Sequence, residues 1–262
     1  MFRKDRDSKS YESMVDHELP FYPKRGFRDH WFQTGGQPSF LKEFFRSGSL
    51  KDPKNFAAVK SIPFSQLGGP AIGENFSEVD LLTQAGCLTI KSVDGNIAIV
   101  DYSTEEVRHA MACMYLHPLL GKTIEQAGVI NFADRLAKDS PESLVYVFNR
   151  LLETVDYETY SIEDIKSVLV VIQVAMTSAG VSPVIKVIGK EGSALEVPVG
   201  ERAIVLVLEY CHPDQEAEQL LQDAVRQLDK RPSGKLGGSL EVLKLALVFF
   251  EPERRITEWS VA

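Results

Sequence analysis

Residues 184–231 read VIKVIGKEGSALEVPVGERAIVLVLEYCHPDQEAEQLLQDAVRQLDKR, and this stretch decides the fold class. The runs 184–188 and 193–199 are short, apolar and bounded by Gly or Pro, a pattern that is typical of strands. The run 203–208, AIVLVL, is apolar without alternation, which indicates a central strand covered on both faces. Residues 215–231 then place apolar side chains at helical spacing. The stretch therefore predicts three strands followed by a helix.

The flanking segments extend this pattern to residues 123–262. The segment 162–180 is apolar on almost all sides, which predicts a helix packed across a sheet. The run 242–250 and the last segment, ITEWSVA, read as two further strands. We therefore expect an α/β domain over 123–262, with one mixed sheet flanked by helices.

The first part of the chain divides into two segments. Residues 1–30 are polar and contain two prolines and a glycine, which predicts a loose start. Residues 31–122 contain a predicted β-hairpin, 87–102, between two helices, and we expect a mostly helical, winged-helix-like region there. DNA recognition by this unit is disfavoured, because the second helix offers only Arg108 and His109 as basic groups and begins with two acids.

Composition excludes several classes of protein. The chain has 262 residues, 44% of them hydrophobic and 25% charged, as in soluble globular proteins. No apolar run approaches the roughly 20 residues of a membrane span, and the polar start has no signal-peptide core. The net charge of −8 argues against non-specific nucleic-acid binding, although Arg226, Lys230, Arg231 and Lys235 could form a local basic patch.

The cysteines suggest a reducing environment. Cys87, Cys113 and Cys211 are odd in number and widely spaced, which fits neither a disulfide framework nor a zinc knuckle. We therefore expect a cytoplasmic location.

Three strings resemble segments of a known family. They are HWFQTGGQPSFLKEFFRSG (30–48), EVDLLTQAGCLTIKSVDGNIAIVDYSTEEVRHAM (78–111) and LALVFFEPERRITEWSV (245–261). With the order of the predicted elements, they resemble the PD-(D/E)XK nuclease superfamily. More narrowly, residues 28–262 are similar to the C-terminal part of bacterial predicted AAA-ATPase-like proteins that carry such a nuclease domain. The resemblance implies a restriction-endonuclease-like core. The family's P-loop region is absent, so no ATP site is expected.

The resemblance also implies site residues. The family places an acid on one strand and an E-x-K motif on the next, and its acids bind Mg²⁺ while its lysine helps to activate the attacking water. Here Glu196 and Glu209, 13 positions apart, take the acid positions, and Cys211 stands at the motif lysine. Gln227 resembles a glutamine of the helix that follows. Carboxylates suit Mg²⁺ as hard oxygen ligands.

Two features of this assignment remain open. A neutral thiol at Cys211 cannot replace the lysine's ammonium near a phosphate, so a basic group from Lys186, Lys190 or Arg226 would have to substitute. Glu163 is a third candidate metal ligand beside Glu196 and Glu209, but it can equally be a carboxylate that complements the positive end of a helix. The two other acids can equally belong to solvated strand ends or salt bridges.

Three function classes follow. The first, favoured by the missing lysine and the acidic charge, is a diverged, catalytically impaired nuclease-like protein that acts in binding nucleic acid or a protein partner. The second is an active Mg²⁺-dependent DNA or RNA endonuclease that uses Glu196 and Glu209 with a relocated basic residue. The third is a thiol enzyme using Cys211 and His212, which is disfavoured because neighbouring residues of a strand point to opposite faces.

Overall fold

The computed structural model describes residues 56, 60–63, 67, 78–120, 131–188, 192–230 and 241–262. The predicted loose segment 1–30 lies outside these residues, as do Lys190, Arg231 and Lys235 and the side chain of Lys186.

The described residues between 131 and 262 form a layered α/β body. Its elements, in chain order, are α6 (Phe132–Lys138), α7 (Pro141–Leu152), α8 (Ile165–Ser178), β4 (Val184–Ile188), β5 (Gly192–Val199), β6 (Arg202–Cys211), α9 (Ala217–Asp229), β7 (Glu241–Phe250), the 3₁₀ turn η4 (Glu251–Glu253) and β8 (Arg255–Val261). The predicted strands and helices of this half are thus present, with ends that differ by a few residues.

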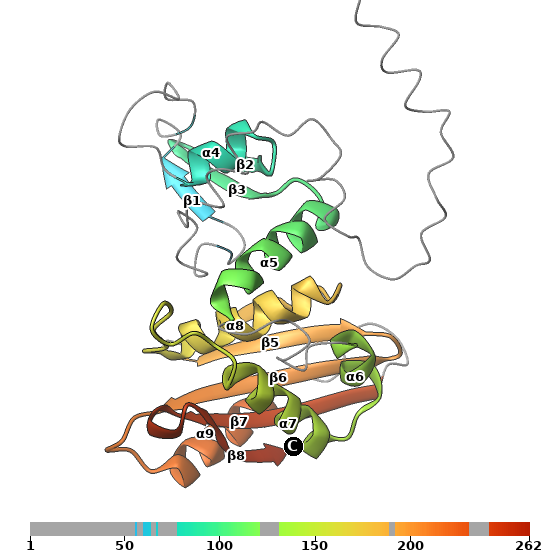
Figure 1. The fold of residues 1–262 in the computed structure, drawn as a ribbon, viewed down its shortest axis with the longest axis vertical. Helices are drawn as coiled ribbons and strands as arrows, with labels where there is room; N and C mark the ends of the chain where they lie inside the picture. Colours follow the sequence, from blue (N-terminus) through green and yellow to red (C-terminus); the bar gives the residue numbers. More distant parts are fainter. Residues whose placement is uncertain are drawn as a thin grey trace, which may run out of the picture.

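The five strands form one mixed sheet in the order β4-β5-β6-β7-β8. Strands β6 and β7 are parallel and the other neighbours are antiparallel, because α9 carries the chain across one face before β7 begins. Helices α7 and α8 pack against the opposite face (Figure 1). The prediction of a mixed sheet flanked by helices is confirmed.

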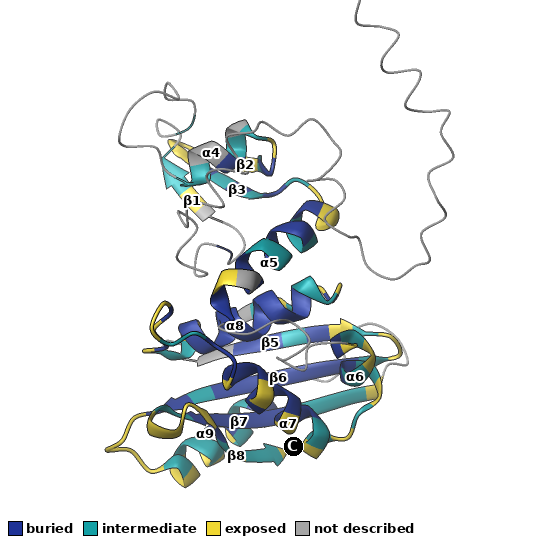
Figure 2. Cartoon of the chain, in the orientation of Figure 1, coloured by how far each residue is buried: buried dark blue, intermediate teal, exposed yellow. Residues whose placement is uncertain are grey.

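Strand β6 lies at the centre of the core. Every side chain from Ala203 to Leu208 is at most 4% exposed, which agrees with the unbroken apolar run in the sequence (Figure 2). Alternate side chains of β6 pack on opposite faces of the sheet. Ile204, Leu206 and Leu208 pack in the large core beneath α7 and α8, while Val205 and Val207 pack against α9.

Helix α8 is buried on two sides. It begins at an Asp164 cap, whose carboxylate accepts from the Ser167 N–H at 2.7 Å, and it is followed by Gly180 at φ +81°. Its core residues, from Val168 to Met176, are nearly all inaccessible because the sheet covers one side and helix α5 (Glu105–Leu119) the other (Figure 1).

The described residues before α5 form a smaller antiparallel unit. Strands β2 (Leu88–Asp94) and β3 (Ile97–Tyr102) make the predicted hairpin, and β1 (Lys60–Pro63) pairs with β3 in the order β1-β3-β2. Helix α4 (Glu78–Gln84) precedes the hairpin. Figure 1 shows α5 as the link from this unit to the α/β body.

Candidate functional site

The β5–β6 hairpin fixes which residues of the predicted site can meet. A two-residue turn joins Val199 to Arg202, and Gly200 takes its first position with φ +60°, as a type II′ turn requires. Every cross-strand pair in this hairpin has residue numbers that add to 401; Glu196 opposite Val205 is one of them. By the same rule Glu209 stands opposite position 192, which is a glycine.

Glu209 lies on the α9 face of the sheet, at the carboxyl end of β6. It follows Val205 and Val207 on that face, and it meets Gln227 of α9, whose Nε2 donates to Glu209 Oε1 at 2.7 Å. The strong apolar stripe of α9 explains this contact, because burying Ala224 and Leu228 against the sheet brings Gln227 over the strand end. The structure therefore joins two of the predicted site residues, Glu209 and Gln227.

Glu196 shares this face but lies far from Glu209. It stands opposite Val205, four residues before Glu209 on β6, so at about 3.3 Å per residue the two lie roughly 13 Å apart along the strand direction. The β5 positions of this face that lie nearer to Glu209 are Gly192, opposite it, and Ala194, which pairs with Val207 and is fully buried. The 13-residue spacing therefore does not place the two carboxylates together.

Cys211 is a buried, protonated thiol on the same face as Glu209. It is 0% exposed, and its Sγ lies 3.5 Å from the His212 carbonyl oxygen and 3.6 Å from that of Gln215. Burial, and then the negative charge of Asp214, raise the pKa of the thiol above its ordinary value. The side chain at the motif lysine position is therefore uncharged.

Cys211 and His212 do not form a nucleophile and base. The His212 ring packs against Tyr210, with ring centroids 4.8 Å apart, and its Nδ1 lies 2.8 Å from Glu251 Oε2. Tyr210 belongs to the large core on the opposite side of the sheet from Glu209. The alternation of side chains along β6 thus separates the thiol from the imidazole.

We expect the three cysteines to differ sharply in reactivity toward a thiol reagent such as Ellman's reagent in the folded protein. Cys113, which is partly exposed, should react first. Cys87 and Cys211 are buried, and burial raises the pKa of Cys87 to about 11, so almost none of it is thiolate at pH 8. Mass spectrometry of partly labelled protein checks the order. Fast labelling of Cys211 before unfolding would contradict the placement of this thiol.

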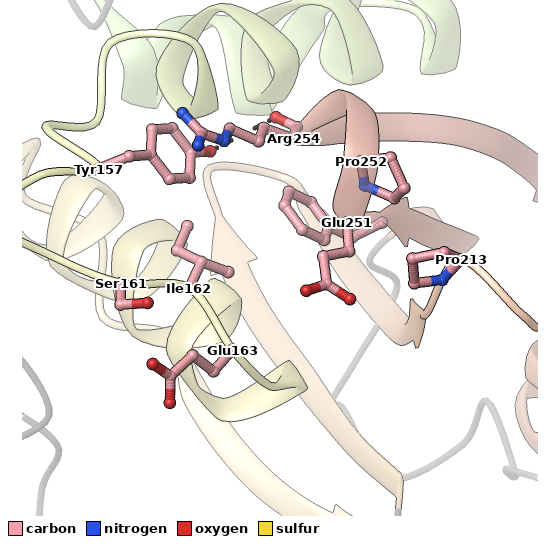
Figure 3. Close-up of a pocket in the computed structure, with 9 residues that line it drawn as sticks. Tyr157, Ser161, Ile162, Glu163, Pro213, Glu251, Pro252 and Arg254 are labelled. Carbon is pink, nitrogen blue, oxygen red and sulfur yellow. Dashed lines mark hydrogen bonds between the residues drawn. The ribbon is translucent and has the colours of Figure 1, made fainter.

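Glu163 lies on the other side of the sheet from Glu209. It precedes the Asp164 cap of α8, next to Ile162, whose carbonyl oxygen accepts from the Tyr210 hydroxyl at 3.0 Å. There it lines a pocket of about 560 Å³ at the carboxyl ends of the parallel strands β6 and β7. The lining residues are Tyr157, Ser161, Ile162, Glu163, Pro213, Phe249, Glu251, Pro252 and Arg254 (Figure 3).

The pocket combines an apolar floor with charged walls. Figure 3 shows Glu163 and Glu251 on one side and Arg254 over Tyr157 on the other. The Arg254 guanidinium carbon lies 4.4 Å from the Tyr157 ring centroid, a cation–π contact, and Arg254 itself has φ +55°. Burial, together with the charges of Glu251, Asp164 and Glu163, raises the pKa of Tyr210 beneath them to about 12. The pocket therefore presents two carboxylates and one guanidinium around its apolar residues.

The predicted magnesium site is not assembled by its three carboxylates. Glu163 is separated from Glu209 by the sheet, and Glu196 by about 13 Å along it. Over the described part of the chain, no group of three or more His, Cys, Asp or Glu side chains could hold a metal ion. Arg226, the candidate replacement for the lysine whose side chain is described, is exposed and pairs with Asp223 of its own helix.

The sequence contained a signal for the separation of Glu196 from Glu209. V-G-E-R between two apolar runs is a two-residue hairpin turn, and its position alone sets Glu209 opposite residue 192. The pocket was missed because its walls come from segments nearly 100 residues apart, Tyr157 to Glu163 and Glu251 to Arg254. They are brought together by contacts between distant segments, the Tyr210 hydroxyl with the Ile162 carbonyl and Arg254 with the Tyr157 ring.

Comparisons with protein families, with curated proteins and with solved structures found no match to this chain. None of the described helices is long and apolar enough to cross a membrane.

Proposed function

We propose that this chain is a diverged nuclease-fold protein that acts by binding a protein partner and does not hydrolyse phosphodiesters. The observation that carries the proposal is the carboxyl end of β6, where β5 puts no second carboxylate beside Glu209 among the described residues. Glu209 stands opposite Gly192 on β5, the next residue on that face is the buried Ala194, and Cys211, a buried protonated thiol, follows two positions on. Metal-assisted hydrolysis needs oxygen ligands that converge on one ion and a positive charge for the transition state.

The nuclease ancestry is supported by the order of elements in the body. Helix α8, the antiparallel strands β4, β5 and β6, the crossover helix α9 and the parallel strand β7 follow one another as a PD-(D/E)XK core would require. The contact between Gln227 and Glu209 supports it further, since these are two residues that the resemblance places in the site.

A protein partner is favoured over nucleic acid by the charge of helix α4 in the small N-terminal unit. Its strand order, β1-β3-β2 with α4 before the hairpin, supports the winged-helix-like interpretation. Winged-helix proteins that bind DNA present a basic helix to the phosphates, whereas α4 reads EVDLLTQ, with two acids and no basic residue. We therefore assign this unit to protein contacts, in a cytoplasmic setting.

The pocket beside Glu163 is the binding surface that we propose on the α/β body. The carboxylates of Glu163 and Glu251 would receive a basic side chain of the partner, while Ile162 would contact its aliphatic part. The net charge of −8 attracts such a partner over a longer range.

A nicking assay tests the absence of catalysis. The full chain, with Mg²⁺ or Mn²⁺, should cleave supercoiled plasmid, single-stranded DNA and RNA no faster than its Glu209→Gln variant, which keeps the contact geometry to Gln227 but lacks the charge. Metal-dependent cleavage by the wild type that the substitution abolishes would establish the alternative, an active endonuclease, and would overturn the proposal.

Binding is tested on the same preparations by fluorescence anisotropy. Labelled Lys/Arg-rich peptides should bind the wild type at low salt and bind a Glu163→Gln/Glu251→Gln variant at least tenfold more weakly, whereas a DNA duplex should bind neither. The exposed pair Glu218→Gln/Glu253→Gln is the matched control for net charge. Equal peptide affinity for both double variants would refute the pocket as the binding surface.

A further inference from the structure

His109 and Cys113 form a second cluster of reactive side chains, outside the site described above. They stand four residues apart on α5, so they share one face of that helix, and this face lies against the end of α8. The Cys113 Sγ and His109 Nε2 atoms lie 3.8 Å apart. Both side chains are partly exposed, so small ions in solution can reach them.

The tautomer of His109 follows from its other contact. Its Nδ1 lies 2.8 Å from the carbonyl oxygen of Thr177, which can only accept, so Nδ1 carries the hydrogen and donates it. In the neutral ring the lone pair therefore belongs to Nε2, which faces the Cys113 sulfur. A histidine whose Nδ1–H is held by a backbone carbonyl while Nε2 faces a second ligand has the arrangement found in metal-binding histidines.

From this arrangement we propose that His109 and Cys113 bind a thiophilic d¹⁰ metal ion, Zn²⁺ or Cu⁺. These ions accept imidazole and thiolate together. Zinc takes nitrogen at about 2.0–2.1 Å and sulfur at about 2.3 Å, which in tetrahedral geometry puts the two ligand atoms about 3.6 Å apart. The observed 3.8 Å corresponds to a bond angle of about 120° at the metal, so the pair can bind the ion almost without moving.

The end of α8 favours a cation at this place. The carbonyl oxygens of Thr177 and Ser178 point toward the pair, the latter 3.8 Å from Cys113 Sγ. The last turn of a helix carries a partial negative charge, which disfavours a bare thiolate and stabilises a metal ion next to it. Within the described residues no third His, Cys, Asp or Glu completes the group, so water or an external ligand fills the remaining positions.

Metal binding exchanges one proton for the ion. The Cys113 S–H bond breaks, its proton passes to solvent and a sulfur–metal bond forms, with no change of oxidation state. Because the Cys113 thiol must lose its proton to bind the ion, the affinity should fall as the pH is lowered.

The site would lie at the contact between two parts of the chain. His109 and Cys113 belong to α5, which leads from the small N-terminal unit, whereas the carbonyl oxygens that orient them belong to α8 of the α/β body. An ion that binds only the folded arrangement stabilises it by mass action. Zinc should therefore raise the melting temperature of the full chain.

The test is a metal titration of the full-length protein under reducing, chelator-free conditions. Co²⁺, as a spectroscopic substitute for Zn²⁺, should give a thiolate-to-cobalt charge-transfer band at one equivalent, and Zn²⁺ should displace it. Cys113→Ser should abolish the band and His109→Gln should weaken binding at least tenfold. Cys211→Ser removes a buried thiol elsewhere in the protein, so it should leave the charge-transfer band and the metal affinity unchanged. A bathocuproine competition gives the Cu⁺ affinity.

Circular dichroism of the metal-free variants separates loss of the site from loss of the fold. If Cys113→Ser melts where the wild type does without metal, yet gains nothing from Zn²⁺, the proposal is supported. Absence of a charge-transfer band in the wild type, or a band that persists in Cys113→Ser, would overturn it. If the Cys113→Ser variant does not fold, the titration of His109→Gln decides instead. Metal binding at least tenfold weaker than in the wild type supports the proposal, and unchanged binding overturns it.

Discussion

Replacing Asn149 by alanine is expected to lower the free energy of unfolding by about 2–4 kcal/mol. Asn149 is 7% exposed on α7, and its side chain makes two hydrogen bonds to the backbone of β8: Nδ2 donates to the Ile256 carbonyl at 3.0 Å, and Oδ1 accepts from the Ile256 N–H at 2.7 Å. The amide thus pairs with both the N–H and the carbonyl of Ile256 on the edge strand, as the backbone of a sixth strand would. Alanine leaves both groups buried and unpaired. Urea unfolding followed by circular dichroism measures the loss.

Two further variants make this test specific. Tyr146→Ala, on the same helix but 61% exposed, should change stability by no more than about 0.5 kcal/mol. Asn149→Asp should be destabilised at neutral pH, because one carboxylate oxygen then faces the Ile256 carbonyl. That environment raises the folded-state pKa of the aspartate above its unfolded value, so stability should recover as the pH falls through the folded pKa. An alanine variant as stable as the wild type would show that the amide does not secure β8.

Replacing Phe249 by alanine is expected to cost about 3–5 kcal/mol, the second large effect. Phe249 is fully buried on β7, and its ring centroid lies 5.5 Å from that of Tyr210 on the neighbouring strand. It also lines the pocket beside Glu163. Truncation removes the contacts of an aromatic ring and leaves a cavity between the sheet and the loop before α8.

The measurement is again equilibrium unfolding, with Phe250→Ala as the matched control. Phe250 follows on the opposite face and is only half-buried, so its truncation should cost less than half as much. Similar losses for the two phenylalanines would mean that their side chains are not buried as unequally as the structure has them. In the peptide-binding assay Phe249→Ala should also weaken binding, since the pocket floor is lost.

Much of the architecture could be predicted from local sequence. Ser140 followed by Pro141 predicts a helix start, and in the structure Ser140 caps α7 with Pro141 in its first turn. The run AIVLVL predicted a strand covered on both faces, and β6 is that strand. These predictions succeed because caps, turns and hydrophobic periodicity act over a few residues. The order helix, three strands, helix, two strands then leaves few ways to form one sheet.

The candidate site followed from sequence only in part. Gln227 and Glu209 meet as the resemblance implied, because an amphipathic helix after a strand returns across it. Glu196 and Glu209 were paired by their separation along the chain, but contact across a hairpin depends on the turn, and a two-residue turn at Gly200 displaces them by four residues. Glu163 was grouped with them although the sheet itself lies between it and Glu209.

The sequence by itself thus determined the strands, the helices, their caps and the α/β class, since each depends on residues that are neighbours in the chain. Only the tertiary structure decided which side chains share a face and a row of the sheet. It buried Cys211, separated the three carboxylates, and brought Tyr157 to Arg254 and His109 to the end of α8. The physical reason is that strand pairing and helix packing are settled by burial of the whole core, to which distant segments contribute together.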